Sequence, residues 1–201
     1  MYMKITIATH NQHKRDEFIA LASYHKLDLA LSMTPVVDEP CETGTTFIEN
    51  ALIKAKDTIK AVAGQYVLAE DSGLCVPSLG GRPGLYSARF AGEAANSRDN
   101  ILHLQALLSD EAKTQAVPAY YYAMIVILRS PTDQQPIIQE GVMNGKVLVE
   151  PQEDIDGFGY DPIFIPDGEH KTLNQLPKQF KNAHSHRSKA FLKAIQALTK
   201  E

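Results

Sequence analysis

The feature that most restricts the fold is residues 119–129, AYYYAMIVILR, a run rich in aromatic and β-branched side chains. Such side chains fit the pleated surface of a sheet, so the run predicts a long strand. A second β-prone stretch follows at residues 136–150, and we expect the two to be antiparallel neighbours. Inside it, Asn144-Gly145 is the strongest short signal for a two-residue hairpin, so we expect a turn there.

Helical and shorter apolar patterns surround these strands. Four stretches predict helices, at residues 14–24, 45–64, about 96–108 and 185–200. Two predict strands, at residues 3–9 and 65–71. Early helices, long antiparallel strands in the middle and a final helix predict an α/β fold with a mixed sheet. Because no repeat or long linker separates parts of the chain, we expect residues 1–201 to form a single domain.

Composition narrows the class of protein. The formal charge of −4 and the pI near 6.0 give no general attraction to nucleic acid, so any anionic ligand must be held locally. The two cysteines cannot form a framework of several disulfides, and no apolar run reaches about 18 residues. No secretory leader precedes the first strand. We expect a cytoplasmic protein with reduced thiols that binds neither nucleic acid nor membrane.

The turn between the first strand and the first helix is polar. Strand-to-helix turns favour phosphate because the helix start offers free N–H groups and a positive dipole end. Phosphate loops usually contain glycine, and this turn has none. It is either a phosphate site with side chains in place of glycine or only a polar turn. Its residues are Thr9, His10, Asn11, Gln12, His13 and Lys14.

Two acidic positions could hold a metal. Glu42 precedes a helix start, and Asp71 follows Glu70 at a strand end. Mg²⁺ uses one or two protein carboxylates together with phosphates and waters, although solvated loop charges are the alternative. Glu49 lies three residues after Thr46 in a capping-box pattern, so we interpret it as a helix cap.

Two later stretches could bind a base or an anion. Phe158 lies between glycines in GFGYDPIF, where an exposed ring can stack on a base or a buried one can fill the core. The basic stretch KNAHSHRSK, residues 181–189, leads into the last helix. Cations at a helix start oppose the dipole unless an anion lies between them, although a solvated basic surface is the alternative. Histidines 10, 13, 184 and 186 lack the Cys or HExxH context that favours zinc.

Taken together, five ordered blocks resemble a known family. The blocks are IATHNQHKRDEF, ETGTTFIENALIKAK, LAEDSGLCVPSLGGRPGLYSARFAG, GFGYDPIF and KNAHSHRSKA. The chain resembles the Ham1-like inosine triphosphate pyrophosphatases, also called non-canonical purine NTP pyrophosphatases. The resemblance implies hydrolysis of ITP, dITP and XTP to the monophosphate and pyrophosphate, with Mg²⁺, by a homodimer. It also implies an elongated mixed sheet flanked by helices, with the nucleotide in a cleft between two lobes.

The same resemblance assigns roles to individual residues. Glu42 and Asp71 would bind Mg²⁺, Asp71 would also accept a proton, and Ser72 would contact substrate. The residues assigned to the phosphates are Thr9, His10, Asn11, Gln12, His13, Lys14 and Lys54. Those assigned to the base pocket are Phe158, Gly159, Tyr160, Asp161, Lys181, His186 and Arg187.

The chain departs from the family pattern in the polar turn and beside the metal ligands. The family usually has glycine at His10, often glycine at His13, Asp at Glu70 in bacterial members, and an apolar residue at His184.

Three other functions compete with the resemblance. They are a Maf-like pyrophosphatase acting on modified pyrimidines, a nucleotide-binding regulator without turnover, and a dinucleotide-dependent oxidoreductase. The last lacks the GxGxxG fingerprint in the first turn.

Overall fold

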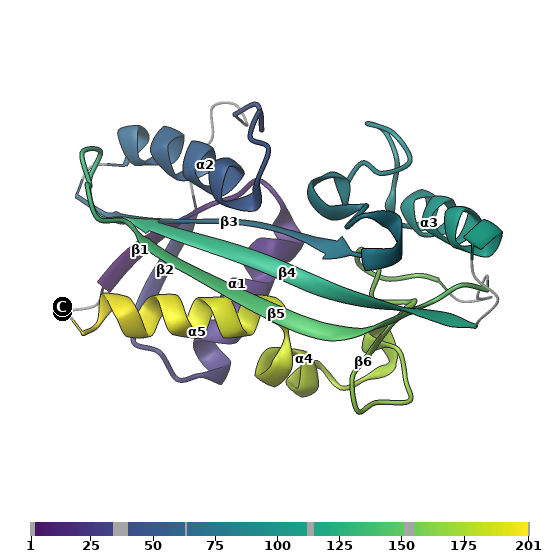
Figure 1. The fold of residues 1–201 in the computed structure, drawn as a ribbon. Helices are drawn as coiled ribbons and strands as arrows, with labels where there is room; N and C mark the ends of the chain where they lie inside the picture. The colour runs from purple at the N-terminus through teal and green to yellow at the C-terminus, as the bar shows by residue number, and fades with distance from the viewer. Residues whose placement is uncertain (1–2, 34–39, 63, 112–114, 151–154, 201) are drawn as a thin grey trace. The chain divides into compact units, whose positions relative to one another are not determined.

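The structure is a computed structural model that describes residues 3–33, 40–62, 64–111, 115–150 and 155–200 (Figure 1). Its strands are β1 (Met3–Ala8), β2 (Leu29–Met33), β3 (Tyr66–Cys75), β4 (Ala116–Leu128), β5 (Ile137–Leu148) and β6 (Phe164–Pro166). Its α-helices are α1 (Gln12–Tyr24), α2 (Phe47–Ala61), α3 (Ser97–Glu111), α4 (Lys178–His184) and α5 (His186–Leu198).

The strands form one mixed sheet in the order β2-β1-β3-β4-β5-β6. β1 pairs in parallel with both β2 and β3, whereas β5 pairs antiparallel with β6. The predicted α/β fold with a mixed sheet and flanking helices is therefore confirmed. The expected strands near residues 3–9, 65–71 and 119–129 are present as β1, β3 and β4.

The chain divides into two compact units. Unit 1 comprises residues 1–71, 123–141 and 186–201, and unit 2 comprises residues 72–122 and 142–185. β3 runs from unit 1 into unit 2, β4 runs from unit 2 into unit 1, and β5 runs back into unit 2. These three adjacent strands therefore alternate in direction, which confirms that β4 and β5 are antiparallel neighbours. The expectation of a single domain stays a prediction.

In unit 1, helices bury both faces of the sheet. Ala123, Ile125 and Ile127 of β4 belong to a cluster with α1 and α5, whereas Val126 and Leu128 belong to one with α2. Alternate residues of a strand point to opposite faces, so this division places α2 on one face and the other two helices on the other. Figure 1 shows α2 and α5 on opposite sides of these strands. The apolar character of residues 123–128 follows, because both faces are covered.

Unit 2 has its own core, built mainly from α3 and the second halves of the long strands. Ile101, Leu104 and Leu108 lie on one face of α3 and are at most 1% exposed. They pack in one cluster with Val117 of β4 and Val147 of β5. Each unit therefore has a hydrophobic core that can position polar side chains at its surface.

The predicted hairpin at Asn144-Gly145 is wrong, because β5 continues through both residues. Gly145 instead allows β5 and β6 to lie close together, since a Cβ there would lie 2.3 Å from the carbonyl oxygen of Ile165 on β6. The chain reverses between β4 and β5, where the Asp133 carboxylate accepts from the backbone N–H groups of Arg129 and Gln135, both at 2.9 Å. An aspartate turn thus replaces the expected Asn-Gly turn.

The basic stretch before the last helix is also arranged differently from the expectation. Residues 181–184 form the end of the short helix α4, and residues 186–189 form the start of α5. Lys181 and His184 consequently lie in the last turn of α4, where cations complement the helix dipole. The expected opposition between these cations and a helix start does not arise for those two side chains.

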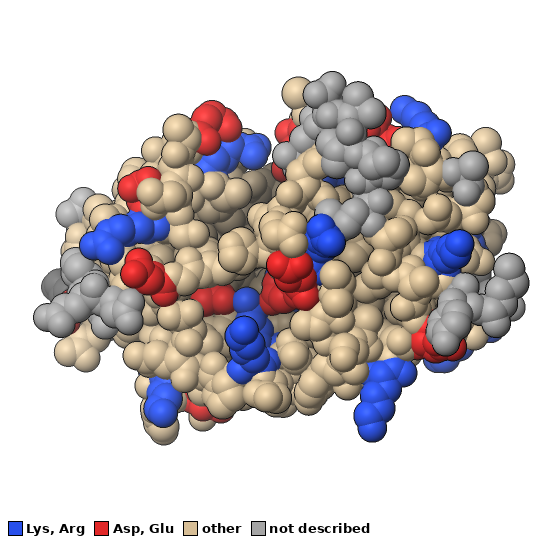
Figure 2. Space-filling model, turned by 180° about the vertical axis from the view of Figure 1, so that it is seen from behind, with Lys and Arg blue, Asp and Glu red and all other residues tan. Residues whose placement is uncertain are grey.

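None of the helices built from described residues combines the length and apolar character needed to cross a membrane. On the face in Figure 2, the basic and acidic side chains of the described residues lie among one another. That mixed pattern agrees with the small formal charge of −4.

Candidate active site

The polar turn after β1 is organised by Asn11. Its side-chain oxygen caps α1 by accepting from the backbone N–H of Lys14 at 3.2 Å, and its own N–H donates to Thr9 Oγ1 at 3.2 Å. His10, Asn11, Gln12 and His13 are exposed. Gln12 Nε2 also donates to Asp16, one turn further along α1. The turn thus presents exposed polar side chains at a helix N-terminus, as the sequence predicts.

The absence of glycine from this turn has a simple explanation. Among non-glycine residues in the described ranges, Lys26 alone has a positive φ, at 53°. His10 and His13 therefore stand in backbone conformations that any side chain adopts. The loop does not require glycine here, so its difference from the family pattern involves no backbone strain.

Behind the turn lies a buried ionic network. Lys14 Nζ is 2.8 Å from Glu70 Oε2, and Arg187 contacts Glu70 Oε1 through Nε at 3.1 Å and Nη2 at 3.0 Å. Arg187 also pairs with Glu17, and its guanidinium lies 6.0 Å from the centre of the Phe18 ring. Glu70 is 3% exposed and Arg187 is 2% exposed. The network joins α1, β3 and α5, and it fixes the end of Lys14.

A second cluster of charges lies within unit 1, at the middle of β3. The expected strand end at Asp71 is wrong, because β3 continues through Ser72 and Gly73 to Cys75. Lys54 Nζ, on α2, is 2.8 Å from Glu42 Oε1 and 3.2 Å from Asp71 Oδ1. The other oxygen of Asp71 accepts from Asn50 Nδ2 at 3.2 Å. Asn50 and Lys54 are four residues apart and therefore share one face of α2. Two carboxylates thus meet at a single ammonium.

The charges in this cluster shift one another's pKa values. Burial raises the pKa of Asp71 above its ordinary range, and the ammonium groups of Lys54 and Lys14 oppose that shift only in part. For Lys54, burial would lower the pKa, but Asp71 and Glu42 outweigh it and raise the pKa. A carboxylate with a raised pKa is a stronger base than an ordinary aspartate.

Unit 2 holds the aromatic stretch predicted for the base. Lys181 Nζ lies 2.7 Å from Asp161 Oδ2 and 5.7 Å from the centre of the Phe158 ring. Tyr121 donates its hydroxyl hydrogen to Asp161 Oδ1 at 2.9 Å and accepts from the backbone N–H of Tyr160 at 3.2 Å. Asp161 therefore holds the Lys181 ammonium, which lies near the half-buried Phe158 ring.

Tyr160 belongs to the interior of the loop. It is 2% exposed, and its hydroxyl donates to the carbonyl of Ser87 at 3.0 Å. Gly159 has a φ of +58°, which favours glycine, and its N–H donates to Ser97 Oγ at 3.1 Å. These contacts shape the loop that carries Phe158.

The structure thus assembles the predicted residues in two groups. Unit 1 holds the polar turn, Glu42, Lys54, Asp71, His186 and Arg187, whereas unit 2 holds Ser72, Phe158, Gly159, Tyr160, Asp161 and Lys181. The sequence prediction missed Asn50, Glu17 and Tyr121. Asn50 had a usable signal, since it precedes Lys54 by one helical turn. Glu17 and Tyr121 had none, because their partners are distant in the sequence.

The donor set near Lys54 suits a hard divalent cation. Glu42 and Asp71 offer carboxylate oxygens, and both reach the same ammonium, so both can reach one cation in its place. Mg²⁺ needs only one or two carboxylates when phosphate and water complete its shell. Within the described residues, no group of three or more His, Cys, Asp and Glu side chains is arranged to hold a metal ion.

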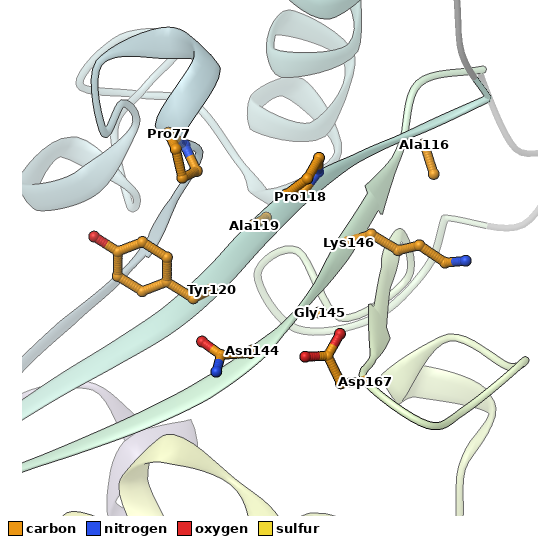
Figure 3. Close-up of a pocket in the computed structure, with 9 residues that line it drawn as sticks. All are labelled: Pro77, Ala116, Pro118, Ala119, Tyr120, Asn144, Gly145, Lys146 and Asp167. Atoms are coloured by element: carbon orange, nitrogen blue, oxygen red, sulfur yellow. The ribbon is translucent and has the colours of Figure 1, made fainter.

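A separate pocket of about 450 Å³ lies on unit 2 (Figure 3). None of the predicted site residues lines it. β4 and β5 supply most of its walls, and Lys146 and Asp167 supply its charged side chains. Neither of these two makes an ion pair with another side chain of the described ranges. The pocket therefore marks an open face of the β4-β5 pair rather than the predicted chemistry.

Comparison with known proteins identifies the family of this chain. Residues 5–197 match the Ham1 family. The chain is 40% identical over 195 residues to the dITP/XTP pyrophosphatase of Shigella flexneri, and the aligned region covers 97% of this chain and 98% of that protein. Its fold is similar to that of the HAM1 protein from Coxiella burnetii, with a TM-score of 0.82, 32% identity and coverage of 99% and 100% of the two chains. The Staphylococcus aureus Ham1 protein gives a TM-score of 0.80, with 32% identity and coverage of 98% and 100%. With sequence and fold matched over nearly its whole length, this chain belongs to the Ham1 family.

Proposed function

We propose that this protein hydrolyses the non-canonical purine triphosphates ITP, dITP and XTP to the monophosphate and pyrophosphate, using Mg²⁺. Hydrolysis would clear these nucleotides before they are incorporated into DNA or RNA. The observation that carries the proposal is the meeting of Glu42 and Asp71 at Lys54 Nζ, in the unit that also contains the polar turn. Carboxylates for a metal and cations for a triphosphate are what phosphoryl chemistry requires, since charge neutralisation and positioning dominate it.

In this proposal, Asp71 accepts the proton of the attacking water. Its raised pKa suits that role, and the hydrogen bond from Asn50 Nδ2 fixes the direction of its carboxylate. Bound Mg²⁺ would supply charge neutralisation on the phosphates. Lys14 and the N-terminus of α1 would hold the phosphate chain, because both offer positive charge at the polar turn.

Selectivity would come from hydrogen-bond donors at the base. Hypoxanthine and xanthine carry an oxygen at C6 where adenine carries an amine, and a donor at that place can reject adenine by ~10⁴. Of the three candidate donors, Lys181 alone belongs to the same unit as Phe158, and its Nζ lies 5.7 Å from the centre of that ring, whereas His186 and Arg187 belong to unit 1. We therefore assign the contact with the C6 oxygen to Lys181 and the stacking contact to Phe158.

A panel of nucleotides tests this function. Pyrophosphate release from ITP, XTP, ATP and GTP is measured with Mg²⁺ and again with EDTA. We expect release from ITP and XTP to be much faster than from ATP or GTP, and to stop with EDTA. Equal rates on all four nucleotides would overturn the assignment, and a preference for modified pyrimidines in an extended panel would favour a Maf-like activity.

We also propose that the protein is a cytoplasmic homodimer, with the pocket face of unit 2 as the interface. Ala116, Pro118 and Tyr120 of β4 line this face and form an apolar surface beside Lys146 and Asp167. A two-fold interface places each residue opposite its reciprocal partner, so Lys146 of one copy can meet Asp167 of the other.

Charge reversal tests the interface. Light scattering during size-exclusion chromatography should give a dimer mass for the native chain and a monomer mass for Lys146→Asp or Asp167→Lys. The double variant restores opposite charges and should recover the dimer. A native monomer, or single variants that remain dimeric, would refute the choice of this face.

A further inference from the structure

We propose that Lys54 makes metal binding conditional on nucleotide binding. Without nucleotide, its ammonium occupies the position between Glu42 and Asp71 that a metal would need. When a triphosphate arrives with its metal, the ammonium moves to the phosphates and the carboxylates become available. The inference rests on the proposed function, because it takes these two carboxylates as the metal ligands.

The first argument is occupancy of the carboxylate oxygens. Asp71 Oδ1 lies 3.2 Å from Lys54 Nζ, and Asp71 Oδ2 accepts from Asn50 Nδ2 at 3.2 Å. Both oxygens of this carboxylate therefore have protein partners, and one oxygen of Glu42 is 2.8 Å from the same ammonium. A metal that binds Asp71 Oδ1 must therefore approach an oxygen that the Lys54 ammonium already contacts.

The second argument is charge. Glu42, Asp71 and Lys54 together carry one net negative charge when all three are ionised. A divalent cation that joined them with the ammonium still in place would sit beside another cation in a largely buried site. The side chains of Lys54 and Asp71 are only 8% and 9% exposed, so water screens this repulsion poorly. Metal binding without nucleotide is therefore weakened by a positive charge that the protein itself supplies.

The third argument is the alternative partner. A triphosphate carries several negative charges and competes well for a flexible lysine, whose four-carbon stem allows its ammonium to move while α2 stays fixed. Movement of Lys54 to the phosphates leaves two unpaired carboxylates beside a metal. Nucleotide and metal then favour each other's binding, and this coupling is reciprocal by thermodynamic linkage.

The test measures metal binding in the absence of nucleotide. Lys54→Met removes the ammonium and keeps most of the stem, and Lys56→Met alters an exposed lysine on the same helix as a control. Mn²⁺ binding is followed by electron paramagnetic resonance or calorimetry. We expect Lys54→Met to bind Mn²⁺ at least about tenfold more tightly than the native chain, because a neighbouring positive charge is gone. Lys56→Met should match the native chain.

Unchanged or weaker Mn²⁺ binding by Lys54→Met would overturn the inference. Lys54→Gln provides a second variant, since its amide can still donate to a carboxylate and preserve the fold. In both variants Mn²⁺ should raise the thermal midpoint more than it does in the native chain, and an equal or smaller rise would count against the inference. These measurements of metal binding involve no hydrolysis. A negative result in the nucleotide panel would therefore overturn the proposed function, whereas a negative result for Mn²⁺ binding would overturn this inference.

Discussion

Removal of Arg187 is expected to destabilise the protein strongly. Its guanidinium contacts Glu70 at 3.0 and 3.1 Å and also pairs with Glu17, while its side chain is only 3% exposed. Arg187→Met would leave the carboxylates of Glu70 and Glu17 without this cation. Breaking a buried ion pair by removing one partner costs about 3–5 kcal/mol, so we expect a loss of that size in the free energy of unfolding.

Urea denaturation followed by circular dichroism measures this loss. Lys189→Met, on the exposed face of the same helix, serves as a control and should change the free energy of unfolding by less than about 0.5 kcal/mol. The double variant Arg187→Met/Glu70→Gln removes a stranded charge and should lose less than the sum of the single variants. A loss below about 1 kcal/mol for Arg187→Met, or full additivity in the double variant, would refute the view that this network is a buried, coupled unit.

Three further predictions concern the scaffold and are measured by urea unfolding. Gly141→Ala should lower the free energy of unfolding by about 3 kcal/mol, because a Cβ there would lie 2.0 Å from the carbonyl oxygen of His186. Gly64→Ala has open space around the Cβ but a φ of +67°, so it should cost about 1–2 kcal/mol. Equal losses in the two variants would contradict this reasoning. Thr46→Ala should cost about 1 kcal/mol by removing the cap of α2, and no loss would count against the capping box. Burial and the nearby Asp161 raise the pKa of Tyr121. As the pH rises, the unfolded chain therefore loses this proton before the folded chain does, and the free energy of unfolding should fall above about pH 10. The fall should be shallower in Tyr121→Phe, and equal slopes in the two proteins would refute the assignment.

Local patterns predicted much of the fold correctly. The capping box of Thr46 and Glu49 is present, and the β-prone run at residues 119–129 forms β4. These features depend on neighbours in the sequence. The Asn144-Gly145 hairpin failed because a contact with β6, about 20 residues away, uses the glycine for close packing instead. Short elements such as β2, β6 and α4 lack a periodic pattern long enough to predict.

The candidate site shows the same division between local and distant information. The cap-forming Asn11 could be anticipated from its immediate surroundings. The strand end expected at Asp71 was wrong, because β3 continues to Cys75. The joint partnership of Lys54 with two carboxylates could not be anticipated, because it depends on how α2 packs beside β3. Likewise, the resemblance placed Arg187 among base contacts, and only the fold shows its buried pairing with Glu70. Tertiary packing, rather than residue type, decides which charged groups are committed to each other.

The most direct test of the account is pyrophosphate release from ITP at saturating Mg²⁺ by three proteins, namely the native chain, Asp71→Asn and Asp57→Asn. Asp57 is exposed on α2 and provides a matched change of carboxylate to amide. Loss of a general base typically lowers the rate by ~10²–10⁴, so we expect the turnover of Asp71→Asn to fall by at least ~10². Asp57→Asn should keep the turnover of the native chain. Turnover by Asp71→Asn close to that of the native chain would contradict the claim that this cluster carries out the chemistry.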